Sequence, residues 1–396
     1  MNSVFHESIA TTAGPSRVEV LSRPQLGDCA RWARAFSGQC KDARYYELVE
    51  DTIHPEFDYR YFVIRDRTGG VSAIQPFFLL DQDLLAGTSP TVRHAVDFAR
   101  RIWPHFLKLR TLMVGCVAGE AHLDAAGEGA LQLAQDLAAG IMAHARLLKA
   151  RLVVLKEFPE SDRQALGCFV DQGFTRVPSM PMVALSIAYP TFEDYMMRAL
   201  GSRTRAHMRR NFRDAARGAP VELTVVVDIS PFIEEVFPLY ENVYARSTLH
   251  FEKLTKEYFC NLSQRMPDKS RFFIWRRSGK IVAFTYCMIQ GDEFFSEYIG
   301  LDYSVALELH LYYIAFRDMV SWAMSRGFKW YRSSGLNYEP KYHLGCKLDP
   351  IDLYVRHTSS TFNALLIRAL PLLEPVRYDR TLKKFSNYDE LWGRSP

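Results

Sequence analysis

One carboxylate lies in a segment where it could act as an acid or a base. Glu297 falls within residues 293–300, whose aromatic enrichment and alternation predict a β-strand. Its neighbours by alternation, Phe295 and Ile299, are apolar. A carboxylate in apolar surroundings has a raised pKa and is suited to general-base catalysis. The alternative is a glutamate on the solvent face of a half-buried strand, and the sequence leaves both interpretations open.

A second candidate feature is a basic helix at residues 203–217, where Asp214 is the only acid among several arginines. On a helix, Arg203, Arg210 and Arg217 share a face with Arg213. Such a stripe could bind the phosphates of CoA, of a nucleotide-linked substrate or of a tRNA acceptor stem. A solvated helix face explains it equally well. Repulsion between the like charges, which a bound polyanion would relieve, favours binding. The arginines predicted to bind a donor are Arg203, Arg209, Arg210 and Arg213.

The elements that must position Glu297 follow one another in a simple order. Residues 272–275 and 281–289 predict a hairpin, and residues 293–300 add a third strand. Residues 307–326 have helical apolar spacing and end before Gly327, and residues 328–332 begin another strand. The first half of the chain repeats this order without any residue-level repeat, which predicts an architectural duplication. The predicted boundary lies near Tyr189-Pro190, which gives domains 1–190 and 191–396.

Bulk composition indicates an ordinary globular protein of more than one domain. The 396 residues are 48% hydrophobic and 24% charged, and the net charge of +4 does not by itself call for nucleic acid. The seven cysteines include no Cys-x-x-Cys pair, so we predict no metal site. No segment reaches the apolar length of a membrane span, and the N-terminus lacks a signal architecture, so the expected location is the cytoplasm.

The strand, strand, helix, strand order of the second half resembles the acyl-CoA-binding core of the GNAT acyltransferases. Two motifs make it similar to the Fem-type branch of tandem GNAT proteins. One is Tyr338-x-x-Lys341 followed by Leu344-Gly345, directly after the strand that follows the long helix. The other is the helix within residues 195–213, with a leucine, two small residues, an arginine and then paired arginines. The resemblance implies an α+β fold of two GNAT-like domains, each a mixed, mostly antiparallel sheet flanked by helices.

The resemblance also implies acyl transfer to nitrogen, with the base taken from the end of the fourth strand. Counted from a first predicted strand at residues 221–227, the fourth strand of the second half is residues 293–300, where Glu297 lies. Lys341 would stabilise developing negative charge or hold a phosphate, and Tyr338 would protonate the leaving group. The chain departs from the wider GNAT pattern after Gly300, where it has no glycine-rich phosphate-binding turn. Ser304 is the small residue there that we expect to meet an anion at a helix N-terminus.

Three functions remain open at this point. The first is an N-acyltransferase that moves an acyl group from acyl-CoA or acyl carrier protein to a small-molecule or amino-acid-like amine. The second is a Fem-type ligase that uses aminoacyl-tRNA and acts on a peptidoglycan precursor or a small metabolite. The third is a non-catalytic binding module, which would be favoured if Glu297, Tyr338 and Lys341 did not converge. The sequence specifies neither the acceptor nor the acyl chain.

Overall fold

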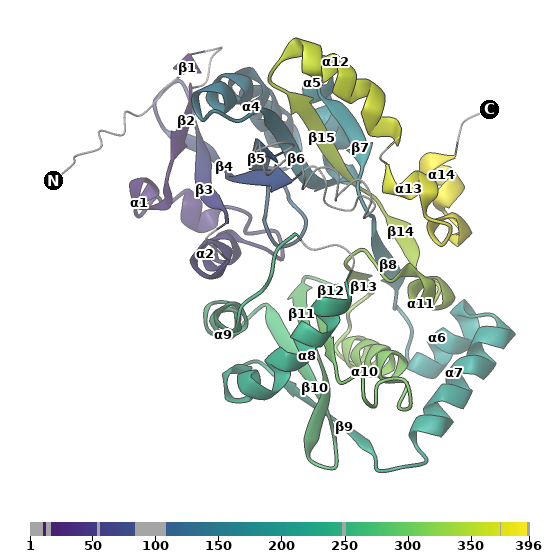
Figure 1. Ribbon diagram of the computed structural model, residues 1–396. Helices are drawn as coiled ribbons and strands as arrows, with labels where there is room; N and C mark the ends of the chain where they lie inside the picture. Colours follow the sequence, from purple (N-terminus) through teal and green to yellow (C-terminus); the bar gives the residue numbers. More distant parts are fainter. Residues whose placement is uncertain are drawn as a thin grey trace, which may run out of the picture. The chain divides into compact units, whose positions relative to one another are not determined.

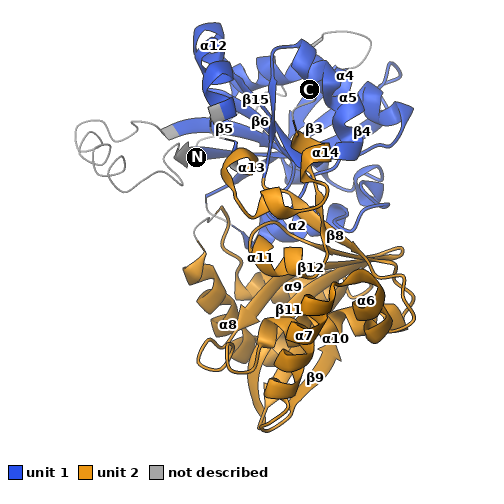
Figure 2. Ribbon diagram, turned by 90° about the vertical axis from the view of Figure 1, so that its right-hand side faces the viewer, with its two compact units in different colours: residues 1–179, 351–375 blue, residues 180–350, 376–396 orange. Residues whose placement is uncertain are grey.

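The computed structural model describes residues 11–12, 17–53, 56–83, 108–247, 251–372 and 374–393. The chain forms two compact units (Figure 2). Unit 1 contains residues 1–179 and 351–375, and unit 2 contains residues 180–350 and 376–396. The chain therefore passes between the units three times and does not divide at the single predicted boundary near Tyr189-Pro190.

Unit 1 is built on an eight-stranded mixed sheet with the order β1-β2-β3-β4-β5-β6-β15-β7 (Figure 1). All neighbouring strands are antiparallel except β5 and β6, which are parallel because a long helix connects them. The strands are β1 Thr11–Thr12, β2 Arg17–Leu21, β3 Asp58–Arg65, β4 Val71–Asp83, β5 Lys108–Val114, β6 Leu152–Pro159, β7 Thr175–Pro178 and β15 Ile351–His357.

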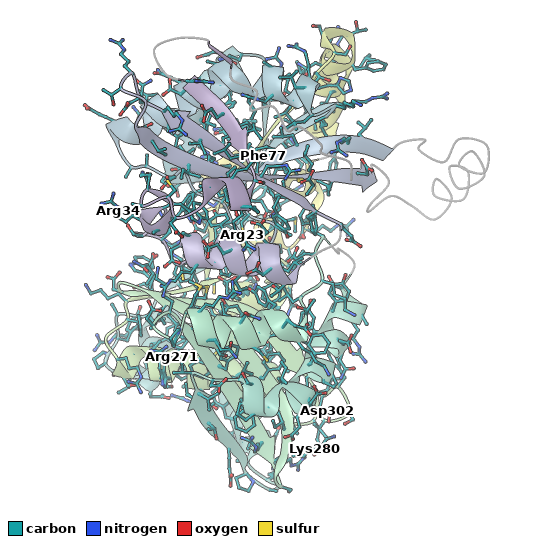
Figure 3. All side chains as sticks on the ribbon, turned by 90° about the vertical axis from the view of Figure 1, so that its left-hand side faces the viewer. Arg23, Arg34, Phe77, Arg271, Lys280 and Asp302 are labelled. Atoms are coloured by element: carbon teal, nitrogen blue, oxygen red, sulfur yellow. The ribbon has the colours of Figure 1, made fainter. Side chains whose placement is uncertain are left out.

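The connecting helix of unit 1, α4 (Glu128–Leu147), buries an apolar stripe that includes Leu133, Leu137 and Ile141 against one face of the sheet. On that face Phe62 stacks on Phe77, with ring centroids 4.2 Å apart. Phe77 is labelled in Figure 3. The other α-helices among the described residues of the unit are α1 Arg23–Leu26, α2 Ala43–Thr52, α5 Arg163–Asp171 and α12 Ser360–Ala369. Helix α13 begins at Pro375 and ends at Tyr378 in unit 2.

Unit 2 repeats this plan with a seven-stranded sheet of order β14-β8-β13-β12-β11-β10-β9. Again one neighbouring pair, β12 and β13, is parallel, and again a helix connects its strands. The strands are β8 Met182–Ser186, β9 Val221–Val226, β10 Ser270–Arg277, β11 Lys280–Gln290, β12 Glu293–Leu301, β13 Trp330–Ser333 and β14 Lys347–Asp349.

Helices cover both faces of the sheet in unit 2. The core on one face includes residues of α10 (Leu311–Ser325), α6 (Phe192–Ala199) and α7 (Ser202–Ala215). On the other face, aromatic rings of α8 (Ile233–Arg246) and α9 (Lys256–Arg265) pack edge-on against β11 and β12. The short helices are α11 Tyr338–His343 and α14 Tyr388–Trp392.

Each unit contains one strand that the predicted boundary would assign to the other unit. Strand β8 precedes the predicted boundary but pairs with β13 in unit 2, and β15 comes from the end of the chain but pairs with β6 in unit 1. Each strand satisfies its backbone groups on the sheet where an edge is free, whatever its place in the sequence. The predicted fold class of two mixed, mostly antiparallel sheets flanked by helices is confirmed.

Candidate functional site

Strands β12 and β13 of unit 2 separate part of the way along the sheet. Their parallel pairing runs from Glu293 and Trp330 to Ser296 and Ser333, where β13 ends. β12 continues for five more residues to Leu301, paired on its other side with β11. The β13 side of this stretch thus has no partner strand among the described residues, and an unpaired strand edge of this kind can bind an extended ligand.

Glu297 is the first residue beyond the end of that pairing. In the β11–β12 ladder, Tyr298 lies opposite Tyr286 and Ser296 lies opposite Cys287, so Glu297 is an extra residue in a β-bulge. A bulge redirects the side chain and interrupts alternation. The predicted alternation of Glu297 with Phe295 and Ile299 therefore does not continue through this position.

The surroundings of the Glu297 carboxylate are largely buried. Burial raises the pKa of the Cys287 thiol, and the charge of Glu297 raises it further. Burial also raises the pKa of the Tyr298 phenol, with a smaller contribution from Glu297. These effects place the carboxylate close to both groups, while the Glu297 side chain itself is only partly buried.

Lys341 is held directly beside this opening. Its Nζ donates to the carbonyl oxygens of Ser334 at 2.5 Å and Leu336 at 3.0 Å, in the loop that follows β13. The Ser334 hydroxyl in turn donates to the carbonyl oxygen of Glu297 at 3.4 Å. Ser334 thus links the two predicted residues, and neither its type nor its spacing in the sequence signalled this.

The Lys341 side chain is buried and makes no ion pair within the described part of the chain. Burial lowers the pKa of its ammonium group to about 8, although the nearby Cys346 thiol acts in the opposite direction. The lysine therefore changes charge close to neutral pH, which is unusual for this residue type.

A pH-dependent stability follows from this lowered pKa. Between about pH 8 and the ordinary lysine pKa of 10.5, the unfolded chain binds more protons at Lys341 than the folded chain does, so this group makes the protein more stable as pH rises. In Lys341→Met this contribution is absent. We expect the free energy of unfolding of the wild type, relative to the variant, to rise by ~1.4 kcal/mol per pH unit in this window. Urea unfolding from neutral to alkaline pH measures it.

The control for this prediction is Lys347→Met, which removes an exposed lysine from β14. Its difference from the wild type is expected to be independent of pH over the same range. If the difference in free energy of unfolding between the wild type and Lys341→Met were also independent of pH, it would contradict the lowered pKa of Lys341.

Tyr338 lies at the start of α11 with its side chain in the core. Its hydroxyl donates to the carbonyl oxygen of Pro181 at 2.7 Å, and its ring packs edge-on against Phe385. These contacts fix the loop between β13 and α11 to the residue preceding β8. They give the Tyr338 proton a structural acceptor in place of a leaving group.

The predicted basic helix is α7, and its arginines differ in their contacts. Arg209 pairs with Glu193 of α6, and Arg210 contacts the His207 ring nitrogen at 3.0 Å. Arg203 and Arg213 are exposed and make no ion pair in the part of the chain that the structure describes. The two exposed arginines are thus free to meet an anion.

Three histidines of α7, α10 and α11 lie near one another, and no sequence pattern predicted this. They are His207, His310 at the N-cap of α10, and His343 of α11. Burial lowers the pKa of His207, and the nearby Arg210, His310 and His343 lower it further. Since they come from three distant segments, no local spacing could have predicted the cluster. It brings α7 and α11 into one region of unit 2.

Ser304 has a partner within the chain. Its backbone N–H donates to Asp302 Oδ1 at 3.0 Å and its hydroxyl donates to the same oxygen at 2.5 Å. Asp302 also pairs with Lys280 at 2.7 Å (Figure 3). A carboxylate thus already accepts from the groups that were predicted to meet an anion of the donor.

The corresponding opening in unit 1 is filled by the chain. β5 and β6 pair as far as Val114 and Leu155, and the chain then loops out and returns so that the N–H of Ala121 donates to the Glu157 carbonyl oxygen at 3.0 Å. The buried Lys41 pairs with Glu120 of this loop at 2.6 Å. Of these two positions, the one in unit 2 leaves a strand edge unpaired beside a carboxylate, and the one in unit 1 does not.

Among the residues that the structure describes, no group of three or more His, Cys, Asp or Glu side chains could hold a metal ion. None of the described helices combines the length and the apolar character needed to cross a bilayer.

Comparison with known proteins identifies the type of domain in unit 2. Residues 202–342 match the family described as an acetyltransferase (GNAT) domain. No curated protein sequence matches the chain.

Several solved structures resemble the chain at low sequence identity. The structure of L-PGS from Bacillus licheniformis is 13% identical with a TM-score of 0.49, over 84% of this chain and 95% of that one. The C-terminal domain of a putative lysylphosphatidylglycerol synthetase from Agrobacterium fabrum is 13% identical with a TM-score of 0.47, over 79% and 88%. FemX is 11% identical with a TM-score of 0.46, over 78% and 90%.

Proposed function

Because the chain belongs to the GNAT superfamily through residues 202–342, we propose that it is an N-acyltransferase. The proposed donor is an acyl thioester, either acyl-CoA or acyl carrier protein, and the acceptor is the amine of a small or amino-acid-like molecule. The observation that carries this proposal is the separation of β12 from β13 at Glu297. It offers an open strand edge to an extended acyl group beside a carboxylate.

In the proposed reaction, Glu297 takes a proton from the attacking amine. The nitrogen forms a bond to the thioester carbonyl carbon, the carbon–sulfur bond breaks, and the thiolate leaves and takes up the proton. Backbone N–H groups of β12 beyond the end of β13 would donate to the carbonyl oxygen as its negative charge develops.

Lys341 and Tyr338 act as positioning residues in this proposal. Lys341 binds two carbonyl oxygens of the loop that follows β13, and Tyr338 anchors the other end of this loop to Pro181. Together they hold the loop in the conformation that keeps the opening beside Glu297. Neither side chain needs to reach the reacting atoms.

Transfer from an aminoacyl-tRNA is the second candidate, and the exposed arginines of α7 favour it. Arg203 and Arg213 have no ion-pair partner among the described residues, and a polyanion would bind both. The backbone N–H and the hydroxyl of Ser304 both donate to Asp302, so they are not donors for a CoA pyrophosphate. The reacting centre at Glu297 would be the same.

Thermal-shift titration of the full chain with acetyl-CoA, longer acyl-CoAs and an aminoacyl-tRNA distinguishes the donors, since a ligand that binds only the folded state raises the melting temperature. Stabilisation by an acyl-CoA is expected. Stabilisation by charged tRNA alone would support the second candidate, and stabilisation by none of these donors would contradict both.

A further inference from the structure

Helix α12 (Ser360–Ala369) in unit 1 is apolar on the side that the protein does not cover. Its inner side carries the buried Asn363, which accepts from the His357 N–H at 2.9 Å and donates to the Gly173 carbonyl oxygen at 3.0 Å. On the outside, Phe362 is 60% exposed and Leu365 is 57% exposed. A helix face with large exposed apolar side chains normally has a partner.

Phe362 and Leu365 form a continuous ridge. They lie three residues apart, and the exposed Ala369 follows four residues later on the same side of the helix. The ring of Phe362 lies against His357, with centroids 5.2 Å apart, at the start of this ridge. The N-terminus of α12 has no side-chain cap, so its first N–H groups remain available to an anion.

Arginines lie on the segments that adjoin the first turn of α12. Arg356 is the next-to-last residue of β15 and lies over the Phe174 ring. The turn before α12 is held by a hydrogen bond from the Thr358 N–H to the Arg151 carbonyl oxygen at 2.8 Å. Burial lowers the pKa of Arg356, and the positive charge of Arg146 lowers it further, which places these two guanidinium groups near each other. Arg146, Arg151 and Arg356 make no ion pair within the described ranges.

We propose that α12 and the cations at its first turn bind the surface of an anionic phospholipid bilayer. Phe362 and Leu365 would enter the boundary between headgroups and acyl chains, and Arg146, Arg151 and Arg356 would meet the lipid phosphates. A bilayer supplies apolar depth and a layer of negative charge together. A protein partner would need acidic groups placed opposite each arginine and an apolar groove for the ridge.

Flotation of the full chain with lipid vesicles tests this. The protein is expected to float with vesicles that contain phosphatidylserine, to remain at the bottom with pure phosphatidylcholine, and to be released from the anionic vesicles by high salt. In the double variant Phe362→Ser and Leu365→Ser, the floating fraction is expected to fall at least about tenfold. The variant Phe362→Trp reports the contact directly, by a blue shift of its emission on anionic vesicles.

The matched control is Leu131→Ser. It removes a leucine that is 40% exposed near the N-terminus of α4, whereas Arg146 lies near the C-terminus of that helix. It is expected to float like the wild type, and circular dichroism establishes that each variant is folded. Two results would overturn the proposal. One is a wild-type protein that stays at the bottom with anionic vesicles. The other is a wild-type dimer that the double variant converts to monomer, since the ridge would then bind a second copy.

Discussion

Replacement of Glu297 by glutamine is expected to lower the rate of acyl transfer by about 10²–10⁴-fold, the usual contribution of a positioned general base. Glutamine has nearly the same shape and cannot accept the proton of the attacking amine. Because Glu297 is the bulged residue at the end of the β12–β13 pairing, no neighbouring strand position presents its side chain in the same way. The assay is thiol release from the acyl-CoA that stabilises the wild type, with a panel of amines as acceptors.

Glu293→Gln is the matched control on the same strand. Glu293 pairs with Arg332 at 2.7 Å at the closed end of β12, four residues from Glu297. This variant is expected to retain the wild-type rate to within a few-fold. Both variants are expected to keep the thermal shift caused by the donor. Wild-type turnover in Glu297→Gln would exclude Glu297 as the base.

Replacement of Lys41 by methionine is expected to destabilise unit 1 by about 3–5 kcal/mol at neutral pH, the usual cost of leaving one member of a buried ion pair alone. Lys41 and Glu120 are both buried and lie 2.6 Å apart. Burial alone would raise the pKa of the Glu120 carboxyl, but the charges of Lys41 and His122 and the bond from Lys41 together hold it at about 2. Without Lys41, the carboxylate remains buried with its main partner missing.

The pH dependence identifies the cause of this loss. In the wild type, the contribution of Glu120 is fully present above its ordinary pKa of 4.5 and is lost as pH falls through about 2. The deficit of Lys41→Met is therefore expected to shrink as pH falls, from the pH above 4.5 at which the buried carboxyl of the folded variant takes up a proton down to about pH 2. Urea unfolding followed by circular dichroism at neutral and acidic pH measures this.

An exposed pair provides the comparison for Lys41→Met. Lys253 and Glu241 lie 2.8 Å apart with about half of each side chain exposed, so Lys253→Met is expected to cost less than about 1 kcal/mol. Equal losses in Lys41→Met and Lys253→Met would show that the buried pair contributes no more than a surface one.

The elements around the site were largely predictable from the sequence. The predicted strand at residues 293–300 is β12, and the basic helix at residues 203–217 is α7. Hairpin alternation and helical apolar spacing are local patterns, so they appear in the sequence directly. The helix predicted at residues 307–326 begins only at Leu311, because residues up to His310 form turns instead.

The sequence could not predict that β8 joins the sheet of unit 2 and that β15 joins the sheet of unit 1. A strand's sequence shows that it has a face to bury, but it does not name the sheet whose edge it completes. Strand β15 pairs with β6, which lies about two hundred residues earlier in the chain. The predicted boundary at Tyr189-Pro190 followed the duplication along the chain and so assigned each exchanged strand to the half in which it occurs.

The candidate residues themselves differ in how well the sequence could place them. The side of β12 on which Glu297 lies could not be predicted without the bulge, because one extra residue changes the side on which every later side chain lies. Lys341 is buried, whereas most lysines are exposed, and its carbonyl partners leave no sequence pattern. The partner of Ser304 could be predicted from the sequence, because an aspartate such as Asp302 commonly accepts a hydrogen bond from the backbone two residues later in a turn.

The most direct test of the central claim is photoaffinity labelling with an acyl-CoA that carries a diazirine in its acyl chain. We predict that mass spectrometry will find the label within residues 297–301 and 334–337, on the two sides of the opening between β12 and β13. Unlabelled acyl-CoA should compete with it. Labelling confined to residues 111–123 and 152–159 of unit 1 would contradict the account, because it would place the acyl group at the opening that the chain itself fills.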